Sequence, residues 1–141
     1  MRAVYLLDTN VISELVKPEA NKGFMEAFNR RADLCAICSV VWQEAVYGYE
    51  LLPEGKRKEK IKQYLDKISE TFDVIPYDTF ASEICGGIRA RCREKGKTAA
   101  YSDSQIAATA IANGMVLITH NTEDYTPIAE VSSLRFEDWW A

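Results

Sequence analysis

Short apolar runs alternate with amphipathic segments along most of the chain, and this alternation constrains the fold more than any other feature. In the segments between the runs, apolar residues recur every three or four positions, as at Trp42, Ala45, Val46 and Tyr49, which predicts helices. Because parallel strands need crossover connections of this kind, the sequence predicts an α/β class with a mainly parallel central sheet flanked by helices. Strands are expected at about 3–7, 33–38, 72–77, 115–119 and 134–139.

The helices are bounded by recognisable start and stop residues. Pro18 should end the first helix, Ser102 and Asp103 should cap the start of the last, and Gly114 should mark its end. No helix is predicted between the last two strands, and Asp124 is expected to lie in a loop there. The helices are expected at about 10–17, 22–31, 39–52, 53–70, 78–95 and 102–114.

Length and composition favour a soluble globular protein. The 141 residues, 48% of them hydrophobic, suit a single domain over 1–141 with a sizeable core. We expect no membrane association and a cytoplasmic location, because no apolar run approaches the roughly 18 residues of a membrane span. The net charge of −4 argues mildly against a protein that coats nucleic acid. A cation held between carboxylates would nevertheless change the local sign of the charge.

The cysteines and the single histidine do not suggest a zinc site. Cys35 and Cys38 lie inside a strand-like run, and Cys85 and Cys92 lie on a helix without the spacing of zinc ligands. Buried free thiols are therefore favoured over a zinc site or a disulfide. His120 is the only histidine, which argues against a Ser/His/Asp triad and favours a structural role or a place at the rim of a site.

Three carboxylates occupy positions where a parallel α/β sheet usually carries its functional crevice. Asp8 directly follows the first strand, Glu44 lies among apolar residues of a helix, and Asp103 opens a later helix. Taken singly, Asp8 and Asp103 are explained equally well as helix caps, and Glu44 as a partly exposed helical residue. We expect Thr9 or Asn10 to cap the first helix, which would leave Asp8 free.

Taken together, the three carboxylates indicate a metal site. Carboxylates crowded into one crevice repel one another unless a cation neutralises them. Ligation by oxygen alone suits Mg²⁺ or Mn²⁺ better than zinc. The commonest use of such a site is in-line displacement at phosphorus.

Four blocks carry a family resemblance: "LLDTNVISEL", "SVVWQEAVYG", "SDSQIAATAIANGMVLITHNTEDY" and a closing Trp. In order and spacing they resemble the PIN-domain ribonucleases, above all the VapC-type toxins of type II toxin–antitoxin pairs. The resemblance spans nearly the whole chain. It implies a PIN-like three-layer sandwich, a Mg²⁺- or Mn²⁺-dependent endoribonuclease that cleaves RNA, a homodimer, and inhibition by a small antitoxin.

The resemblance also assigns roles to individual residues. Asp8, Glu44 and Asp103 match the acidic triad of the family, while Asn10 and Ser39 match polar positions that line the site. Many members carry a fourth acidic residue where this chain has Asn121. Asp124 or Asn121 is expected to assist in its place, so that catalysis with either one or two metals stays open.

Basic residues before Asp103 form a candidate RNA-binding rim. The alternative is a solvated helix face, which is also the interpretation of the second basic run, at 55–62. The candidate rim consists of Arg89, Arg91, Arg93, Lys95 and Lys97.

Two other functions fit parts of the sequence. "LLDTN" resembles the start of haloacid-dehalogenase-type phosphohydrolases, with Asp8 as a covalent nucleophile, but that mechanism wants a second Asp where Asn10 stands. A non-catalytic module that only binds RNA or a partner is the third hypothesis. A trapped phospho-aspartate would favour the former, and metal-independent binding without cleavage would favour the latter.

Overall fold

Five short strands form one parallel sheet in the order β3-β2-β1-β4-β5 in the computed structural model, which describes residues 2–141. The central strand, β1, pairs through Leu6 with Ala36 on one side and with Leu117 on the other. All five strands were expected from the sequence, and each is shorter than its apolar run. They are β1 (Tyr5–Leu7), β2 (Cys35–Cys38), β3 (Val74–Ile75), β4 (Val116–Ile118) and β5 (Phe136–Glu137).

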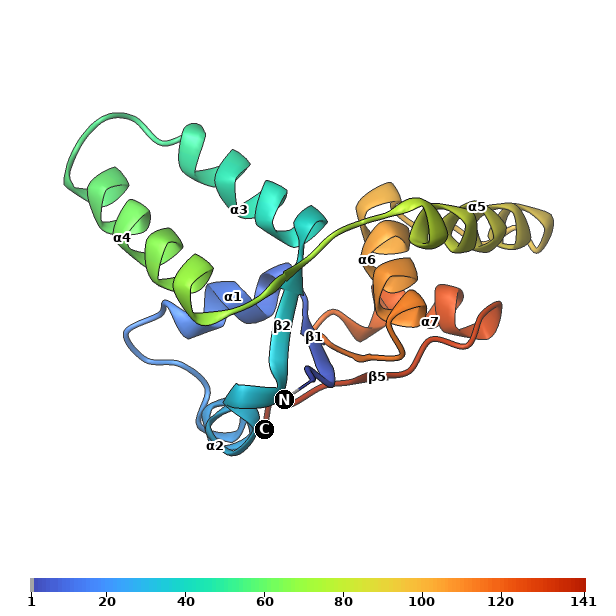
Figure 1. Ribbon diagram of the computed structural model, residues 1–141, viewed down its shortest axis with the longest axis horizontal. Helices are drawn as coiled ribbons and strands as arrows, with labels where there is room; N and C mark the ends of the chain where they lie inside the picture. Colours follow the sequence, from blue (N-terminus) through green and yellow to red (C-terminus); the bar gives the residue numbers. More distant parts are fainter. Residues whose placement is uncertain (1) are drawn as a thin grey trace.

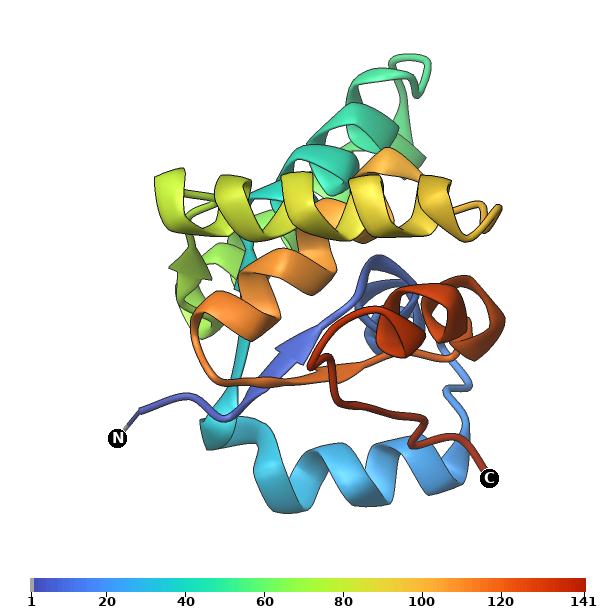
Figure 2. The ribbon, with the colours of Figure 1, turned by 90° about the vertical axis from the view of Figure 1, so that its right-hand side faces the viewer.

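Helices connect the strands and cover both faces of the sheet, as in an α/β sandwich (Figure 1). In Figure 2, α2 lies on one side of β1 and β4, and α5 and α6 lie on the other. The helices are α1 (Thr9–Leu15), α2 (Lys22–Arg31), α3 (Ser39–Glu50), α4 (Lys56–Thr71), α5 (Thr79–Glu94), α6 (Tyr101–Ala112) and α7 (Thr122–Glu130), with a short 3₁₀ turn at Ala32–Leu34.

The core lies on both faces of the sheet, covered by α2 on one side and by α6 on the other. Leu6 and Leu7 of β1 and Leu117 of β4 are fully buried, as expected for strands covered on both faces. The facing side of α6 carries the buried small residues Ala107 and Ala110, which let the helix approach the strands closely. This packing holds the first turn of α6 firmly beside the carboxyl end of β1.

The helices α3 and α4 form an antiparallel arm at one end of the molecule (Figure 1). The apolar stripe expected on α4 faces inward, with Leu65 and Ile68 buried and Ile61 and Tyr64 partly buried. Most residues of the second basic run are exposed, as the sequence suggested, and Lys62 pairs with Asp66 one turn on at 2.6 Å. Lys58 is the exception, because its side chain is largely covered and lies over the ring of Tyr49.

The structure corrects two expectations about helices. Residues 122–130, expected to be a loop, form α7 even though Pro127 lies within it. Its buried Tyr125 and Ile128 stabilise it by packing on the core, which compensates for the weak helical pattern. The other correction concerns α6, which begins at Tyr101 with Ala100 as its N-cap, so that Ser102 and Asp103 lie inside the first turn. Gly114 follows the helix with φ of +64°, as its predicted role requires.

The expectation of free thiols is confirmed. Cys35, Cys38, Cys85 and Cys92 are buried and unpaired. Burial raises the pKa of Cys35 to about 12 and that of Cys38 to about 11, so both remain protonated. Over residues 2–141, no helix has the length and apolar character needed to cross a membrane.

Candidate active site

Asp8 stands at the carboxyl end of the central strand and is only 4% exposed. Its Oδ1 accepts a hydrogen bond from the Thr9 amide at 2.8 Å, and its Oδ2 accepts from Asn10 Nδ2 at 2.9 Å and Thr119 Oγ1 at 2.8 Å. Asp8 is thus the N-cap of α1, and the expectation that Thr9 or Asn10 would cap in its place was wrong. Because a carboxylate has about four acceptor positions, three donors orient Asp8 without exhausting its capacity to bind a further group.

Thr119 and Asn10 connect the carboxyl ends of the neighbouring strands β1 and β4 through hydrogen bonds. Thr119 is fully buried just after β4, and besides donating to Asp8 its hydroxyl accepts from the Asn121 amide at 3.0 Å. Asn10 Oδ1 accepts from the His120 amide at 2.9 Å, while its Nδ2 also lies 3.3 Å from Thr119 Oγ1. The orientation of Asp8 therefore depends on residues 111 positions away in the sequence.

Glu44 approaches Asp8 from the next unit of the fold. It lies on α3, which begins directly after β2, the strand beside β1. Its Oε1 accepts a hydrogen bond of 2.6 Å from Thr9 Oγ1, so one residue contacts Asp8 through its amide and Glu44 through its hydroxyl. Sequence reasoning did not identify Thr9 as a bridge between these two carboxylates.

Asp103 lies in the first turn of α6, half-buried, with the phenol of Tyr125 beside it. Tyr125 Oη donates toward Asp103 Oδ1 at 3.4 Å and also interacts with Asp8. Tyr125 is fully buried, and burial together with the two carboxylates raises its pKa, so the phenol stays protonated. This role could not be predicted from the sequence, because Tyr125 lies on the helix that was not expected.

The electrostatics of the cluster are those of crowded carboxylates. Burial, followed by the charges of Asp8 and Asp124, raises the pKa of Asp103 to about 6. Burial also raises the pKa of Asp8, while the hydrogen bonds from Thr119 and Thr9 oppose that shift and the charge of Glu44 adds to it. The charges of Asp8, Asp124 and Glu44 therefore all act on Asp103, and the charge of Glu44 also acts on Asp8.

The remaining candidate residues lie in different surroundings. Asp124 is exposed in the first turn of α7, not in a loop, and its charge acts on Asp103. Asn121 is the exposed residue that precedes α7. Ser39 Oγ accepts from the Tyr77 amide at 3.0 Å, which ties the start of α3 to the segment after β3. His120 is at the rim, stacked on Trp140 with centroids 4.5 Å apart and paired with Asp138.

The basic residues of the candidate rim lie in three kinds of surroundings. Arg91 donates to the Val131 carbonyl at 2.8 Å, and Lys97 pairs with Glu130, so both hold α5 and its following loop against the end of α7. Arg93 and Lys95 are exposed. Arg89 lies over the ring of Tyr101.

The donor set fits a hard divalent cation by its chemistry. The four carboxylates offer only oxygen ligands, and their mutual repulsion is what a cation would relieve. Within residues 2–141, however, no three Asp, Glu, His or Cys side chains converge tightly enough to form a ready coordination sphere. Thr9 holds Glu44, and three donors hold Asp8. A bound ion would therefore draw together carboxylates that now bond to neighbouring groups of the protein.

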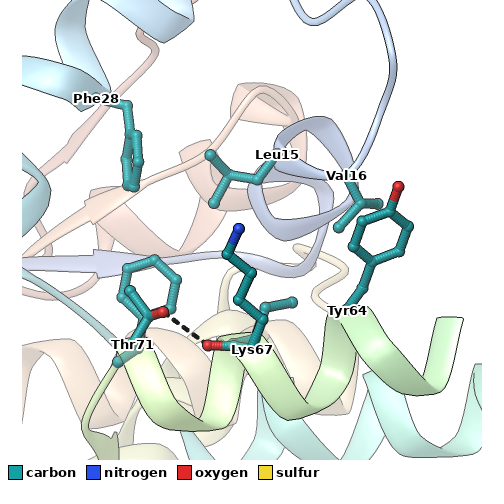
Figure 3. Close-up of a pocket in the computed structure, with 8 residues that line it drawn as sticks. Leu15, Val16, Phe28, Tyr64, Lys67 and Thr71 are labelled. Carbon is teal, nitrogen blue, oxygen red and sulfur yellow. Dashed lines mark hydrogen bonds between the residues drawn. The ribbon is translucent and has the colours of Figure 1, made fainter. Parts of the chain in front are cut away.

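An apolar groove begins beside Glu44 and leads away from the acidic cluster. Its first section, about 330 Å³, runs between α1, α3 and α4 past Thr9, Glu44 and Tyr49. The second section, about 250 Å³, continues between α4 and the segment after α1, and shares Val16 and Tyr64 with the first. Figure 3 shows Leu15, Val16 and Phe28 around this second section, with the Lys67 side chain reaching into it.

The interacting carboxylates lie at the carboxyl ends of parallel strands, where open α/β sheets carry their functional crevice. Residues 5–130 match the PIN domain family model. The tRNA(fMet)-specific endonuclease VapC of Shigella flexneri is 30% identical over 135 residues, covering 96% of this chain and 97% of that protein. The chain therefore belongs to the PIN-domain family and, within it, to the VapC ribonucleases.

Two solved structures agree with this assignment. FitAcB from Neisseria gonorrhoeae is 27% identical with a TM-score of 0.84, covering 94% of this chain and 96% of that one. DNA-bound VapBC from Salmonella typhimurium is 28% identical with a TM-score of 0.80, covering 97% of this chain and 98% of that one. The fold inferred from the resemblance, a PIN-like α/β sandwich, is confirmed.

Proposed function

We propose that this protein is a Mg²⁺- or Mn²⁺-dependent endoribonuclease whose metal is held by Asp8, Glu44 and Asp103, with Asp124 or Asn121 assisting. The observation that carries the proposal is the convergence of these carboxylates at the carboxyl edge of the sheet: Thr9 bonds to both Asp8 and Glu44, and the charges of Asp8, Asp124 and Glu44 act on Asp103. The VapC ribonucleases to which the chain is similar support RNA as the substrate.

A cation bound there would supply Lewis-acid activation of the attacking water and charge neutralisation at the scissile phosphate. The protein's own residues prepare the carboxylates for it. Thr119 and Asn10 hold Asp8 in one orientation, and Thr9 positions Glu44. The Tyr125 phenol donates toward Asp103 and limits its repulsion from Asp8. We expect products with a 5′-phosphate and a 3′-hydroxyl, as the family resemblance implies.

The decisive experiment compares the wild type with Asp8→Asn and Asp103→Asn on single-stranded RNA with Mg²⁺, Mn²⁺ or EDTA. Both variants should lose at least about a hundredfold in cleavage rate, a loss typical for the removal of a group that stabilises charge in the transition state. Asp66→Asn, on the outer face of α4, is the matched control and should cleave like the wild type. Full activity of Asp8→Asn with an intact fold would overturn the assignment.

The same assay separates the rival functions. A phospho-aspartate at Asp8 after incubation with a phosphomonoester would indicate a phosphohydrolase. RNA binding that is equal with Mn²⁺ and EDTA, and never accompanied by cleavage, would indicate a binding module. Cleavage that requires a divalent ion and the acidic residues would exclude both.

We further propose that a small antitoxin inhibits the protein and that the protein forms homodimers. VapBC complexes are among the solved structures it is similar to, which supports such a partner. The apolar groove that begins at Glu44 has a suitable form for it, because an apolar peptide segment seated there would end beside the catalytic carboxylates.

The groove can be tested with the product of a short reading frame adjacent to this gene. Tyr64→Glu places a charge in the wall shared by both sections of the groove and should weaken complex formation at least tenfold. Gln63→Glu, exposed on the same helix, is the control and should bind normally. Light scattering of the free protein at several concentrations would measure the homodimer.

A further inference from the structure

Tyr101 is a large aromatic residue that is exposed to solvent instead of packing in the core. It begins α6, two residues before Asp103, and 70% of its surface is open to solvent. The guanidinium carbon of Arg89 lies 3.4 Å from its ring centroid, which is the distance of a face-to-face stack. Arg89 is itself positioned by the Ala99 carbonyl, which accepts a hydrogen bond from Nη1 at 3.4 Å.

This arrangement leaves an aromatic surface open and held in place. Arg89 covers one ring face, so the large exposed fraction belongs mostly to the other face and the edge of the ring. An Arg–Tyr stack that served only to hold the loop between α5 and α6 would not need an open ring face. Nucleobases are the ligands that stack on such platforms in proteins that bind single-stranded nucleic acid.

The position beside the acidic cluster suits a substrate contact. On a helix, residues two apart point about 200° away from each other, so Tyr101 lies on the opposite side of the turn from Asp103. The first turn of α6 therefore presents a carboxylate to the catalytic crevice and an aromatic ring to its outer rim. Arg89 also adds a positive charge at the ring itself, which would attract the phosphate of a stacked nucleotide.

We propose that Tyr101, backed by Arg89, is a base-stacking subsite for single-stranded RNA that holds a nucleotide flanking the scissile phosphate. This inference rests on the proposed ribonuclease function, and it adds a nucleobase contact to the phosphate contacts expected of the basic rim. Its recognition is sequence-tolerant, because every base has a face that can stack.

Fluorescence quenching tests the subsite without cleavage. Short RNAs that carry 2-aminopurine at successive positions are titrated with the wild type in EDTA, and quenching should peak at one or two adjacent positions. Tyr101→Ala should abolish this quenching and weaken binding about tenfold, an effect of the order expected for one stacked base. Tyr101→Phe should retain the quenching and the affinity, and Arg89→Gln should weaken binding several-fold. Phe80→Ala removes an exposed aromatic ring on α5 and is the control, which should bind and quench like the wild type.

Kinetics separate this inference from the proposed function. In the presence of Mn²⁺, Tyr101→Ala should raise KM about tenfold and leave kcat within about twofold of the wild type. Unchanged quenching and KM in Tyr101→Ala, with the wild type active, would overturn the subsite alone. A change of oligomeric state in that variant, with normal RNA affinity, would also overturn it by assigning Tyr101 to a protein interface. Absence of cleavage by the wild type, with the quenching intact, would overturn only the nuclease.

Discussion

Thr119 shows how one hydrogen bond affects the ionisation of Asp8, a carboxylate of the proposed metal site. Its hydroxyl stabilises the charged form of Asp8, opposing the upward shift in pKa that burial causes. Thr119→Val removes that donor, so the pKa of Asp8 should rise and the acid limb of the pH–rate profile should move to higher pH. We expect about a tenfold loss of activity at neutral pH and roughly 1–2 kcal/mol of stability, measured by cleavage kinetics and urea unfolding.

Thr109→Val is the matched control for this prediction. Thr109 is also fully buried, but its hydroxyl donates to the Gln105 carbonyl within α6, away from the carboxylates. It should lose comparable stability and keep the wild-type pH profile. An unchanged acid limb in Thr119→Val would show that Asp8 does not depend on this hydrogen bond.

Asp103 makes the stability of the metal-free protein depend on pH. Its pKa of about 6 in the folded state lies above the ordinary 3.8, so the folded state binds more protons between these values. The free energy of unfolding should therefore decrease as pH rises from about 4 to about 6. Asp103 is only half-buried, so solvent screens part of the effect. We therefore expect the free energy of unfolding to fall by about 1 kcal/mol, which corresponds to a decrease of about 3 °C in Tm.

The measurement is thermal unfolding in EDTA across this pH range. Asp103→Asn should flatten the dependence and unfold at a higher temperature than the wild type at pH 7. Asp33→Asn, which removes an exposed carboxylate, should retain the wild-type slope. Adding Mn²⁺ should stabilise the wild type and have much less effect on Asp103→Asn. A slope of the opposite sign would mean that Asp103 is stabilised as the anion.

For single residues, the sequence predicted which carboxylates interact but not the hydrogen bonds that orient them. The chain order of strands and carboxylates was enough to propose that Asp8, Glu44 and Asp103 interact, because parallel strands end at one edge. The partners that orient them could not be found in this way. Thr119 looked like an ordinary polar residue after a strand, and Tyr125 contacts Asp103 only because α7 packs as it does.

Asn21 links the start of α2 to Ala141, 120 positions away in the chain. Its side-chain oxygen caps α2 by accepting from the Phe24 amide at 3.0 Å, and it also accepts from the Ala141 amide at 3.1 Å. Its Nδ2 donates to the Ala141 carbonyl at 3.0 Å. Asn21→Ala should therefore destabilise the protein by about 2 kcal/mol, more than the loss of a cap alone, as measured by urea unfolding.

Asp78→Ala isolates the capping contribution. Asp78 caps α5 through a 2.9 Å bond from the Ala81 amide, and its loss should cost about 1 kcal/mol. Equal destabilisation by the two variants would show that the contacts with Ala141 contribute nothing to stability.

Elements with a clear apolar period were predicted well, and those stabilised by distant contacts were not. The stripe on α4 and the small apolar face of α6 are local patterns, and both helices formed. The residues of α7 include Pro127 and few good helix formers, so their helix depends on burying Tyr125 and Ile128. Such tertiary stabilisation is not encoded within a sequence window.

For the whole molecule, the central physical problem is that an acidic protein must hold a polyanion. The net charge is −4, and under the proposed function the scissile phosphate would approach the acidic cluster. Under the proposed function, the metal and the basic rim around Arg89 reverse this repulsion locally. The same cluster that binds the cation should therefore oppose RNA binding when the cation is missing.

This leads to a prediction about binding rather than cleavage. In EDTA at neutral pH, Asp8→Asn and Asp103→Asn should bind single-stranded RNA about two- to tenfold more tightly than the wild type, because each removes a negative charge near the phosphate. Fluorescence anisotropy at low salt would measure this, and the gain should shrink as salt is raised. Glu70→Gln, exposed near the end of α4, removes the same net charge elsewhere and should change affinity much less. Equal gains in all three variants would mean that net charge, not the acidic cluster, limits the approach of RNA.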